Sequence, residues 1–255
     1  MSGLRQAVHA EWTKVRTLPG LLWLLAAVAA LTAAVSAAAV AAAHCPAAGC
    51  AQDPAKLSLT GVQFGQAGVA VLAVLLISGE YGTGMIRTTV AAMPRRTTVL
   101  AAKALVLAGL VLVAGTVAVS GSVLAGRLVL PGHGFAFSPA HGPVLRAAAG
   151  SVAYLVLIAL LSLGIATAVR DSAAAVGAVL GLLYLFPILA SVVSDPDWYR
   201  HLQQIGPMTA GLAIQSTVPS SSPAPIGPYT GLAVLATWST TALLTALTLF
   251  HTRDP

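Results

Sequence analysis

Six long apolar runs constrain this chain more than any other feature of its sequence. They cover 21–43, 61–79, 104–126, 147–169, 172–194 and 229–250, and none contains Asp, Glu, Lys or Arg. A helix of roughly 20 apolar residues crosses about 30 Å of hydrocarbon. The runs lack the alternating pattern of transmembrane barrel strands. The sequence therefore predicts an all-α integral membrane protein with six transmembrane helices.

The composition agrees with this class. Only 8% of the 255 residues are charged and 57% are hydrophobic, whereas about a quarter of the residues in soluble proteins are charged. The net charge of +6 could suggest nucleic acid, but the basic residues are scattered between apolar runs and form no stripe with aromatic residues. We therefore expect a lipid bilayer around this chain and no nucleic-acid partner.

The basic residues predict the orientation of the spans. A cytoplasmic N-terminus places nine of them inside and four outside, which satisfies the positive-inside rule. The inner residues are Arg5, Lys14, Arg16, Arg87, Arg95, Arg96, Lys103, Arg170 and Arg253, and the outer ones are Lys56, Arg127, Arg146 and Arg200. Six spans return the C-terminus to the cytoplasm. An odd number would follow if Arg170 and Asp171 formed no turn, since two residues make a tight connection between helices.

Residues 1–20 precede the first span and have the pattern of an interfacial amphipathic helix. Leu4, Val8, Trp12 and Val15 form an apolar stripe at spacings of four, four and three. Such a helix lies along the membrane surface, with Trp12 at headgroup depth and Lys14 and Arg16 near lipid phosphates. Residues 21–255 then form the transmembrane domain.

Glu11 is an exception within this helix, because helical geometry places it inside the apolar stripe. One interpretation is an exposed carboxylate at the edge of the helix. The other is an ion pair with a loop cation such as Arg87, which would tie the interfacial helix to the segment 80–103.

The basic segment 80–103 separates the second and third apolar runs and predicts a loop with a short amphipathic helix. One side of that helix carries Met85, Ile86, Thr89, Val90 and Met93, another carries Arg87, Thr88 and Ala91, and Pro94 ends the pattern. Topology and the inner leaflet explain Arg95, Arg96 and Lys103. They do not explain Glu80, Tyr81 or the helix 84–93, for which we expect a protein surface as partner.

Two cysteines, Cys45 and Cys50, lie in the first outer loop. An extracytoplasmic setting permits a disulfide, worth about 2 kcal/mol if unstrained. A metal site with His44 would have only three ligands and no second cluster. We favour the disulfide and expect no metal.

Polar and small residues mark two of the spans. The second carries Gln63 and Gln66, and the fifth carries Gly177 and Gly181 at GxxxG spacing. Amides need partners away from lipid, and small residues let helices approach closely. These positions indicate either a substrate path or helix packing.

The long outer segment 195–228 divides into three parts. It begins with acidic and aromatic residues, continues with a moderately apolar stretch over 201–215, and ends in a Ser/Pro-rich stretch. We expect the middle to rest on the outer membrane surface and the end to be an extended linker.

Motifs for catalysis are absent from the sequence. No G-x-x-x-x-G-K-[ST] occurs, so the chain carries no P-loop of its own. All six histidines fall in loops or tails, and no span contains a carboxylate. We name no catalytic residue, although a membrane-surface enzyme using His133 or His141 remains an alternative.

Three stretches together resemble the membrane subunit of type-2 ABC exporters, in the actinobacterial style. They are HAEWTKVRTLPG before the first span, GEYGTGMIRTTVAAMPRR after the second, and PIGPYTGLAVLATW at the start of the last. The likeness is strongest over residues 7–105 and looser beyond them.

The resemblance implies a bacterial plasma-membrane permease that pairs with a second permease subunit and docks two copies of a separate ATPase. ATP and Mg would be bound by that ATPase, and this chain would bind no cofactor. The coupling helix would be 84–93, preceded by Glu80 and Tyr81. The coupling residues implied are Glu80, Tyr81, Gly84, Met85, Ile86, Arg87 and Thr88, flanked by Glu11, Trp12, Lys14 and Arg16.

Two departures from the family stand out. The short turn at Arg170 and Asp171 leaves little inner surface for a second ATPase contact, and no large outer domain is present. The second departure favours a small or lipophilic substrate. The sequence leaves open the cargo, the choice between homodimer and heterodimer, and a non-transporting immunity or sensor role.

Overall fold

The protein is described by a computed structural model covering residues 2–17, 19–43, 52–82, 85, 96–133, 142–217 and 226–252. The regular elements in these ranges are all helices, as predicted. They are α1 (Ser2–Thr17), α2 (Pro19–Ala42), α3 (Pro54–Ser58), α4 (Gly61–Gly82), α6 (Arg96–Val129), the 3-10 turn η1 (Leu130–His133), α7 (Gly142–Val169), α8 (Ser172–Leu180), the π-helical turn η2 (Gly181–Leu185), α9 (Phe186–Ser191), α10 (Pro196–Ile205), α11 (Pro207–Leu212), the 3-10 turn η3 (Ala213–Gln215) and α12 (Pro228–Thr252).

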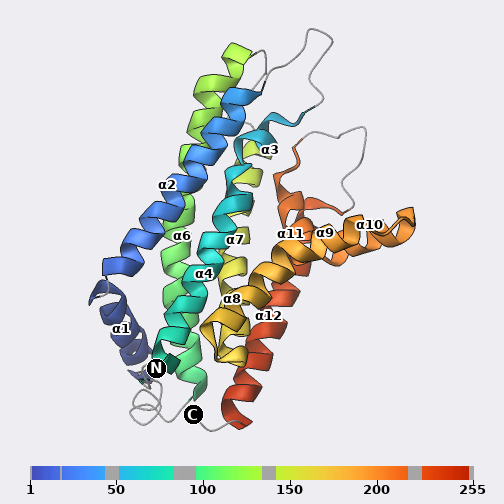
Figure 1. Cartoon of the computed structure of the whole chain (residues 1–255). Coiled ribbons are helices and arrows are strands. Elements are labelled where there is room, and N and C mark those ends of the chain that lie inside the picture. The colour runs from blue at the N-terminus through green and yellow to red at the C-terminus, as the bar shows by residue number, and fades with distance from the viewer. Residues whose placement is uncertain are drawn as a thin grey trace.

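Six helical segments are long and apolar enough to cross a membrane, which confirms the predicted number of spans. In α4 and α7, 61% of the residues of the most apolar stretch are buried, whereas in the other four spans 17–33% are. The bundle is therefore built around α4 and α7, with α2, α6, α8 and α12 packed about them (Figure 1).

The third spanning helix begins earlier than its apolar run. The second continues through Gly82 and the third starts at Arg96, so the segment between them is 83–95 and the expected loop 80–103 is shorter. Glu80 and Lys103 thus belong to helices. Two features favour the earlier start: Leu100, Ala101 and Ala102 have high helix propensity, and the charge of Lys103 is compensated by acidic partners on two other helices.

The connection between α7 and α8 is a true turn of two residues. Arg170 has φ of 64°, a left-handed conformation that reverses the chain. Asp171 caps α8, with its side chain accepting a hydrogen bond of 2.7 Å from the backbone N–H of Ala174. The spans are therefore even in number, and both termini lie at the same end of the bundle (Figure 1).

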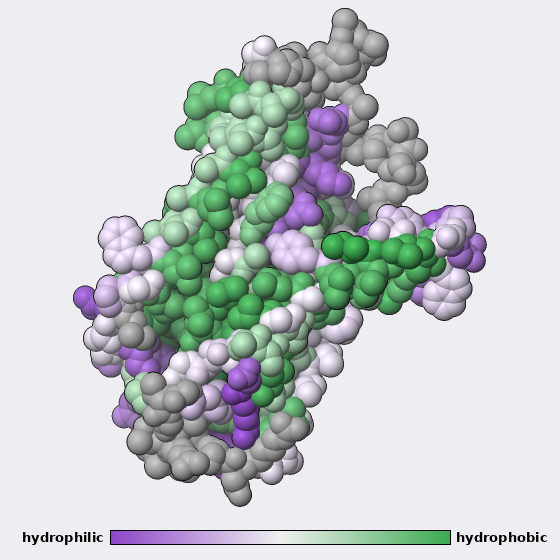
Figure 2. Space-filling view, in the orientation of Figure 1, coloured by the Kyte–Doolittle hydropathy of each residue, from purple (hydrophilic) through white to green (hydrophobic). Residues whose placement is uncertain are grey.

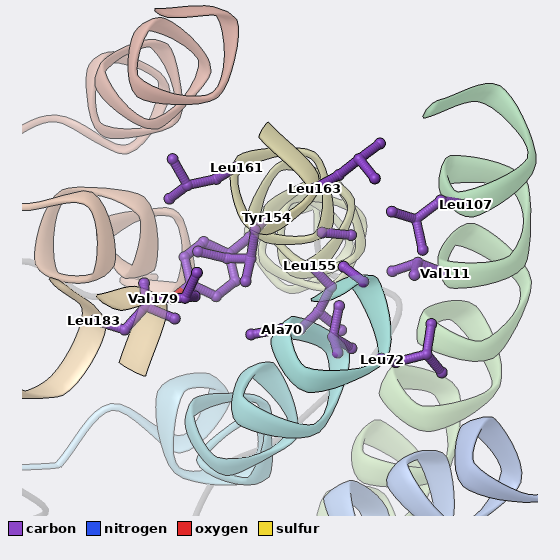
Figure 3. Packing of buried hydrophobic residues seen from close by; sticks show 14 of the residues in the cluster. Ala70, Leu72, Leu107, Val111, Tyr154, Leu155, Leu161, Leu163, Val179 and Leu183 are labelled. Carbon is purple, nitrogen blue, oxygen red and sulfur yellow. The ribbon is translucent and has the colours of Figure 1, made fainter. Parts of the chain in front are cut away.

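The core lies where α4, α6, α7 and α8 meet. Tyr154 and Leu155 of α7 pack among aliphatic side chains of the neighbouring helices, including Leu107 and Leu183 (Figure 3). The Tyr154 hydroxyl donates a hydrogen bond to the amide oxygen of Gln66. A polar group buried at this depth requires such a partner.

Glycines of α4 bring it against α2. A Cβ atom at Gly61 would lie 1.9 Å from the backbone oxygen of Thr32, and one at Gly65 would lie 2.1 Å from the Thr32 hydroxyl. Gly61 and Gly65, which have GxxxG spacing, therefore form a packing surface of the second span. At Gly177 and Gly181 no atom lies within 4 Å of such a Cβ, so among the described residues these glycines mark no close contact.

The outer segment differs from its prediction. Its helix α10 has no buried residues and projects from the bundle (Figure 1), but α11 and η3 are buried against α7 and α12. A Cβ at Gly231 would lie 2.0 Å from the backbone oxygen of Ala210, and one at Gly150 would lie 2.0 Å from Ile214. Residues 207–215 therefore insert between helices, because glycines in α7 and α12 make room for them.

Candidate functional site

Four charged side chains meet where α1, α4 and α6 come together. The ammonium nitrogen of Lys103 lies 2.9 Å from Oε2 of Glu11 and 2.6 Å from Oε1 of Glu80. The ammonium nitrogen of Lys14 lies 2.8 Å from Oε1 of Glu11 and 2.7 Å from Oε1 of Glu80. Each lysine thus bridges both carboxylates, and we call these four residues the charge cluster.

The charge cluster is buried inside the protein. The exposed side-chain fraction is 1% for Lys103, 6% for Glu80 and 8% for Glu11, while Lys14 at 30% reaches the surface. Desolvating a charge is costly unless an opposite charge compensates it. Two acids and two bases make the cluster neutral, which explains why helices that carry them can pack together here.

The position of Lys14 changes its acid-base behaviour. Burial alone would lower its pKa, but the hydrogen bonds from its ammonium group to Glu11 and Glu80 outweigh burial, so the pKa is raised above its usual value of 10.5. Lys14 is thus held in the charged form that both carboxylates need.

The sequence explains how α1 presents these groups. Its buried face carries Ala7, Glu11 and Val15, spaced four residues apart, and packs on α6. Leu4 and Trp12 of the predicted apolar stripe remain 40% and 45% exposed. The residue that interrupts the stripe is therefore the one that anchors the helix to the protein.

A second contact joins the end of α4 to the other side of the bundle. The guanidinium of Arg170 lies 5.6 Å from the ring centre of Tyr81 and donates a hydrogen bond of 3.4 Å to the backbone oxygen of Leu249 in α12. Glu80 and Tyr81 are neighbours in sequence. The last turn of α4 is thus linked through Glu80 to α1 and α6, and through Tyr81 to the α7–α8 turn and α12.

Arg96 links the first turn of α6 to the same end of α12. Its guanidinium lies 5.7 Å from the ring centre of Phe250 and donates a hydrogen bond to the backbone oxygen of that residue. Cations at a helix C-terminus satisfy carbonyl groups that have no intrahelical partner. The expectation that topology and the inner leaflet explain Arg96 and Lys103 is therefore corrected for both residues, because each has a partner inside the protein.

The structure brings together only part of the predicted coupling set. Glu80 and Tyr81 lie in the contacts just described, with Glu11 and Lys14 beside them, and Met85 is exposed. Trp12 and Arg16 are exposed on α1. Gly84, Ile86, Arg87 and Thr88 lie outside the described residues, as do Cys45 and Cys50.

The proposed pair of Glu11 with Arg87 stays a prediction, because Arg87 is not described. Both carboxylate oxygens of Glu11 already accept hydrogen bonds from lysines. Sequence reasoning missed Lys103 as the partner. The available signal was weak: a single lysine one residue before a long apolar run, a position that the positive-inside rule also explains.

The two glutamines of α4 have different surroundings. Gln66 is fully buried, and its amide nitrogen has no hydrogen-bond partner among the described residues. The side chain of Gln63 is exposed, while its backbone oxygen accepts a hydrogen bond of 2.6 Å from the Tyr184 hydroxyl of η2. The outer part of α4 is therefore tied to the π-helical turn through its backbone at Gln63.

The ion pairs of the charge cluster join α1, α4 and α6. No group of three or more His, Cys, Asp or Glu side chains in the described ranges could hold a metal ion. No family model matches the chain, and no curated protein matches it.

Proposed function

We propose that this chain is the permease subunit of a type-2 ABC exporter. It would move a small or lipophilic substrate across the bacterial plasma membrane, with ATP hydrolysed by two copies of a separate ATPase subunit. A second permease subunit, identical or different, would complete the path. The N- and C-termini would both be cytoplasmic.

The observation that carries this proposal is the charge cluster, which lies where the helices on either side of the segment 83–95 meet α1. Glu80 precedes this segment on α4, Lys103 follows it on α6, and both bind α1 through Lys14 and Glu11. A force applied to the segment would therefore reach three helices together. This is the property that a coupling loop requires.

The contact of Tyr81 with Arg170 extends the linkage to the remaining helices. Through it, a displacement of the last turn of α4 would act on the α7–α8 turn and on α12. Transport needs a partner that binds one conformation more tightly than the other. The charge cluster and the contact of Tyr81 with Arg170 join both halves of the bundle, so they would convert such differential binding into movement of the spans.

Four further observations support the assignment. The three stretches that resemble the family occur in its order, and six spans agree with its topology. The termini share the end of the bundle that holds the charge cluster (Figure 1). Nine of thirteen basic residues belong to this side in the predicted topology, which favours the cytoplasm.

The test is to search the neighbouring reading frames for a P-loop ATPase and to reconstitute that protein with this chain. We expect the two proteins to co-purify in detergent and the permease to raise the ATP hydrolysis rate in liposomes. Arg87→Glu should abolish co-purification while membrane insertion stays normal, and Arg200→Glu on α10 is the matched control. Absence of any complex with the unaltered permease would refute the proposal.

A charge-balanced variant separates docking from coupling. Glu80→Gln combined with Lys103→Met removes one acid and one base and leaves the pair of Glu11 with Lys14. We expect this variant to bind the ATPase but to lose its stimulation of hydrolysis. Full stimulation by the double variant would show that the charge cluster is not part of the coupling path.

A further inference from the structure

An apolar groove of about 520 Å³ runs between α1, α2 and α6. Its thirteen lining residues are all apolar or aromatic, with Trp12 on α1, Leu25 on α2 and Leu110 on α6 among them. Gly109 lies on its wall, and no atom comes within 4 Å of a Cβ built there. The groove is thus open space at the level of the membrane, bordered by two spanning helices.

A second hollow, open to the surface and bearing basic side chains on α1, adjoins this groove. It has a volume of about 750 Å³ and is lined on α1 by Arg5, Gln6 and His9, together with Val8 and Trp12, which also line the apolar groove. Arg5, His9, Trp12 and Arg16 follow one another at spacings of four, three and four, so they share one face of the helix. The two hollows therefore form one continuous site with an apolar part and a basic part.

The arginines on this face of α1 form no ion pair within the described part of the protein. Lys14 is engaged by Glu11 and Glu80, but no described carboxylate forms an ion pair with Arg5 or Arg16, both of which are exposed. Hydrophilic residues gather on α1 beside the apolar surface of the spans (Figure 2). Within the described part of the chain, the basic part of the site thus lacks an anion.

We infer that this site binds an anionic phospholipid, with an acyl chain in the groove and the phosphate beside Arg5 and His9. An apolar groove on a spanning surface is filled by something apolar, because water finds no partners there. Trp12 lines both parts of the site. Tryptophan is enriched at the membrane–water interface, where the headgroup and the acyl chains of a lipid meet. The polarity of the site matches the two ends of one lipid molecule.

The same features disfavour a second copy of this chain as the occupant. A spanning helix from another subunit would cover the apolar groove but would leave the basic hollow without an anion. Of the exposed acids in the described part of the chain, Asp195 and Asp197 lie at the start of α10 and Asp171 caps α8, whereas the groove is bordered by α1, α2 and α6. A lipid satisfies both parts at once.

The experiment is native mass spectrometry of the purified full chain in detergent, titrated with phosphatidylglycerol or with phosphatidylcholine. We expect the first phosphatidylglycerol to bind more tightly than the first phosphatidylcholine. Arg5→Gln should weaken only the former, by about fivefold, which is the effect of one cation near an anionic surface. Arg200→Gln, an exposed arginine on α10, should leave both affinities unchanged.

A groove-filling variant tests the apolar part. Gly109→Phe should abolish binding of the first lipid of either kind, whereas Gly177→Phe, at another open glycine of a spanning helix, should not. Equal affinity for the two lipids, or unchanged binding by both Gly109→Phe and Arg5→Gln, would overturn the inference. So would loss of a dimer in Gly109→Phe with lipid binding intact. If Gly109→Phe fails to fold, the Arg5→Gln titration still decides the question.

Discussion

The ammonium group of Lys103 lies 2.6 Å from Oε1 of Glu80, although 23 residues separate the two in sequence. They stand on opposite sides of the segment 83–95, one near the end of α4 and the other in the second turn of α6. The same lysine also binds Glu11, 92 residues away. One buried cation therefore joins three helices.

Replacing Lys103 by Met should strongly destabilise the protein. The change leaves two carboxylates with one lysine, and an uncompensated buried charge costs about 3–5 kcal/mol. Thermal unfolding in detergent measures the effect, with Lys56→Met at an exposed position as the control. Adding Glu11→Gln to Lys103→Met makes the charge cluster neutral again and should recover part of the lost stability. A double variant no more stable than Lys103→Met would contradict this explanation.

The stability supplied by Lys14 should be lost in the alkaline range. Its pKa is raised above 10.5 in the folded protein, so its contribution is complete below pH 10.5 and is lost as the pH rises through the higher folded value. The measurement is the difference in melting temperature between the unaltered chain and Lys14→Met from pH 8 to 12. A difference that already narrows between pH 8 and 9.5 would argue against the raised pKa.

Tyr81 should tolerate the loss of its hydroxyl but not of its ring. The hydroxyl has no hydrogen-bond partner among the described residues, whereas the ring lies under the guanidinium of Arg170. Tyr81→Phe should therefore be nearly neutral. Tyr81→Leu should lose about 0.5–2 kcal/mol of cation–π interaction, as measured by thermal unfolding. Equal losses in the two variants would show that the hydroxyl, and not the ring, makes the important contact.

Glycine substitutions should have opposite signs in α4 and α8. Gly61→Ala forces a methyl group against the backbone of Thr32 and should cost about 1–3 kcal/mol. Gly177→Ala meets open space and should stabilise its helix by roughly 0.5–1 kcal/mol. Thermal unfolding of both variants and of the unaltered chain in detergent measures the two changes in stability. Comparable stability of both would mean that α2 and α4 do not approach as closely as described.

The spans could be predicted from sequence because hydrocarbon imposes a local rule. A run of about 20 residues without charge is sufficient to indicate each helix, and all six appear in the structure. The sequence left open whether Arg170 and Asp171 form a turn, and the structure shows that they do, with Arg170 in the left-handed conformation. Boundaries were less predictable, since α6 begins at Arg96, before its apolar run, and the acidic partners that compensate Lys103 there are distant in sequence.

What only the tertiary structure decided is which charges meet. By sequence, Glu11 interrupts an apolar stripe and Lys103 is explained by topology, since nothing local relates a residue to partners 23 or 92 positions away. Packing of α1 on α6 and of α4 in the bundle core brings these side chains into one buried cluster. The number of spans follows from the sequence alone, because each apolar run is long enough to cross the hydrocarbon. The pairing of charges depends on how those spans pack, because a buried ion is stable only beside its counterion.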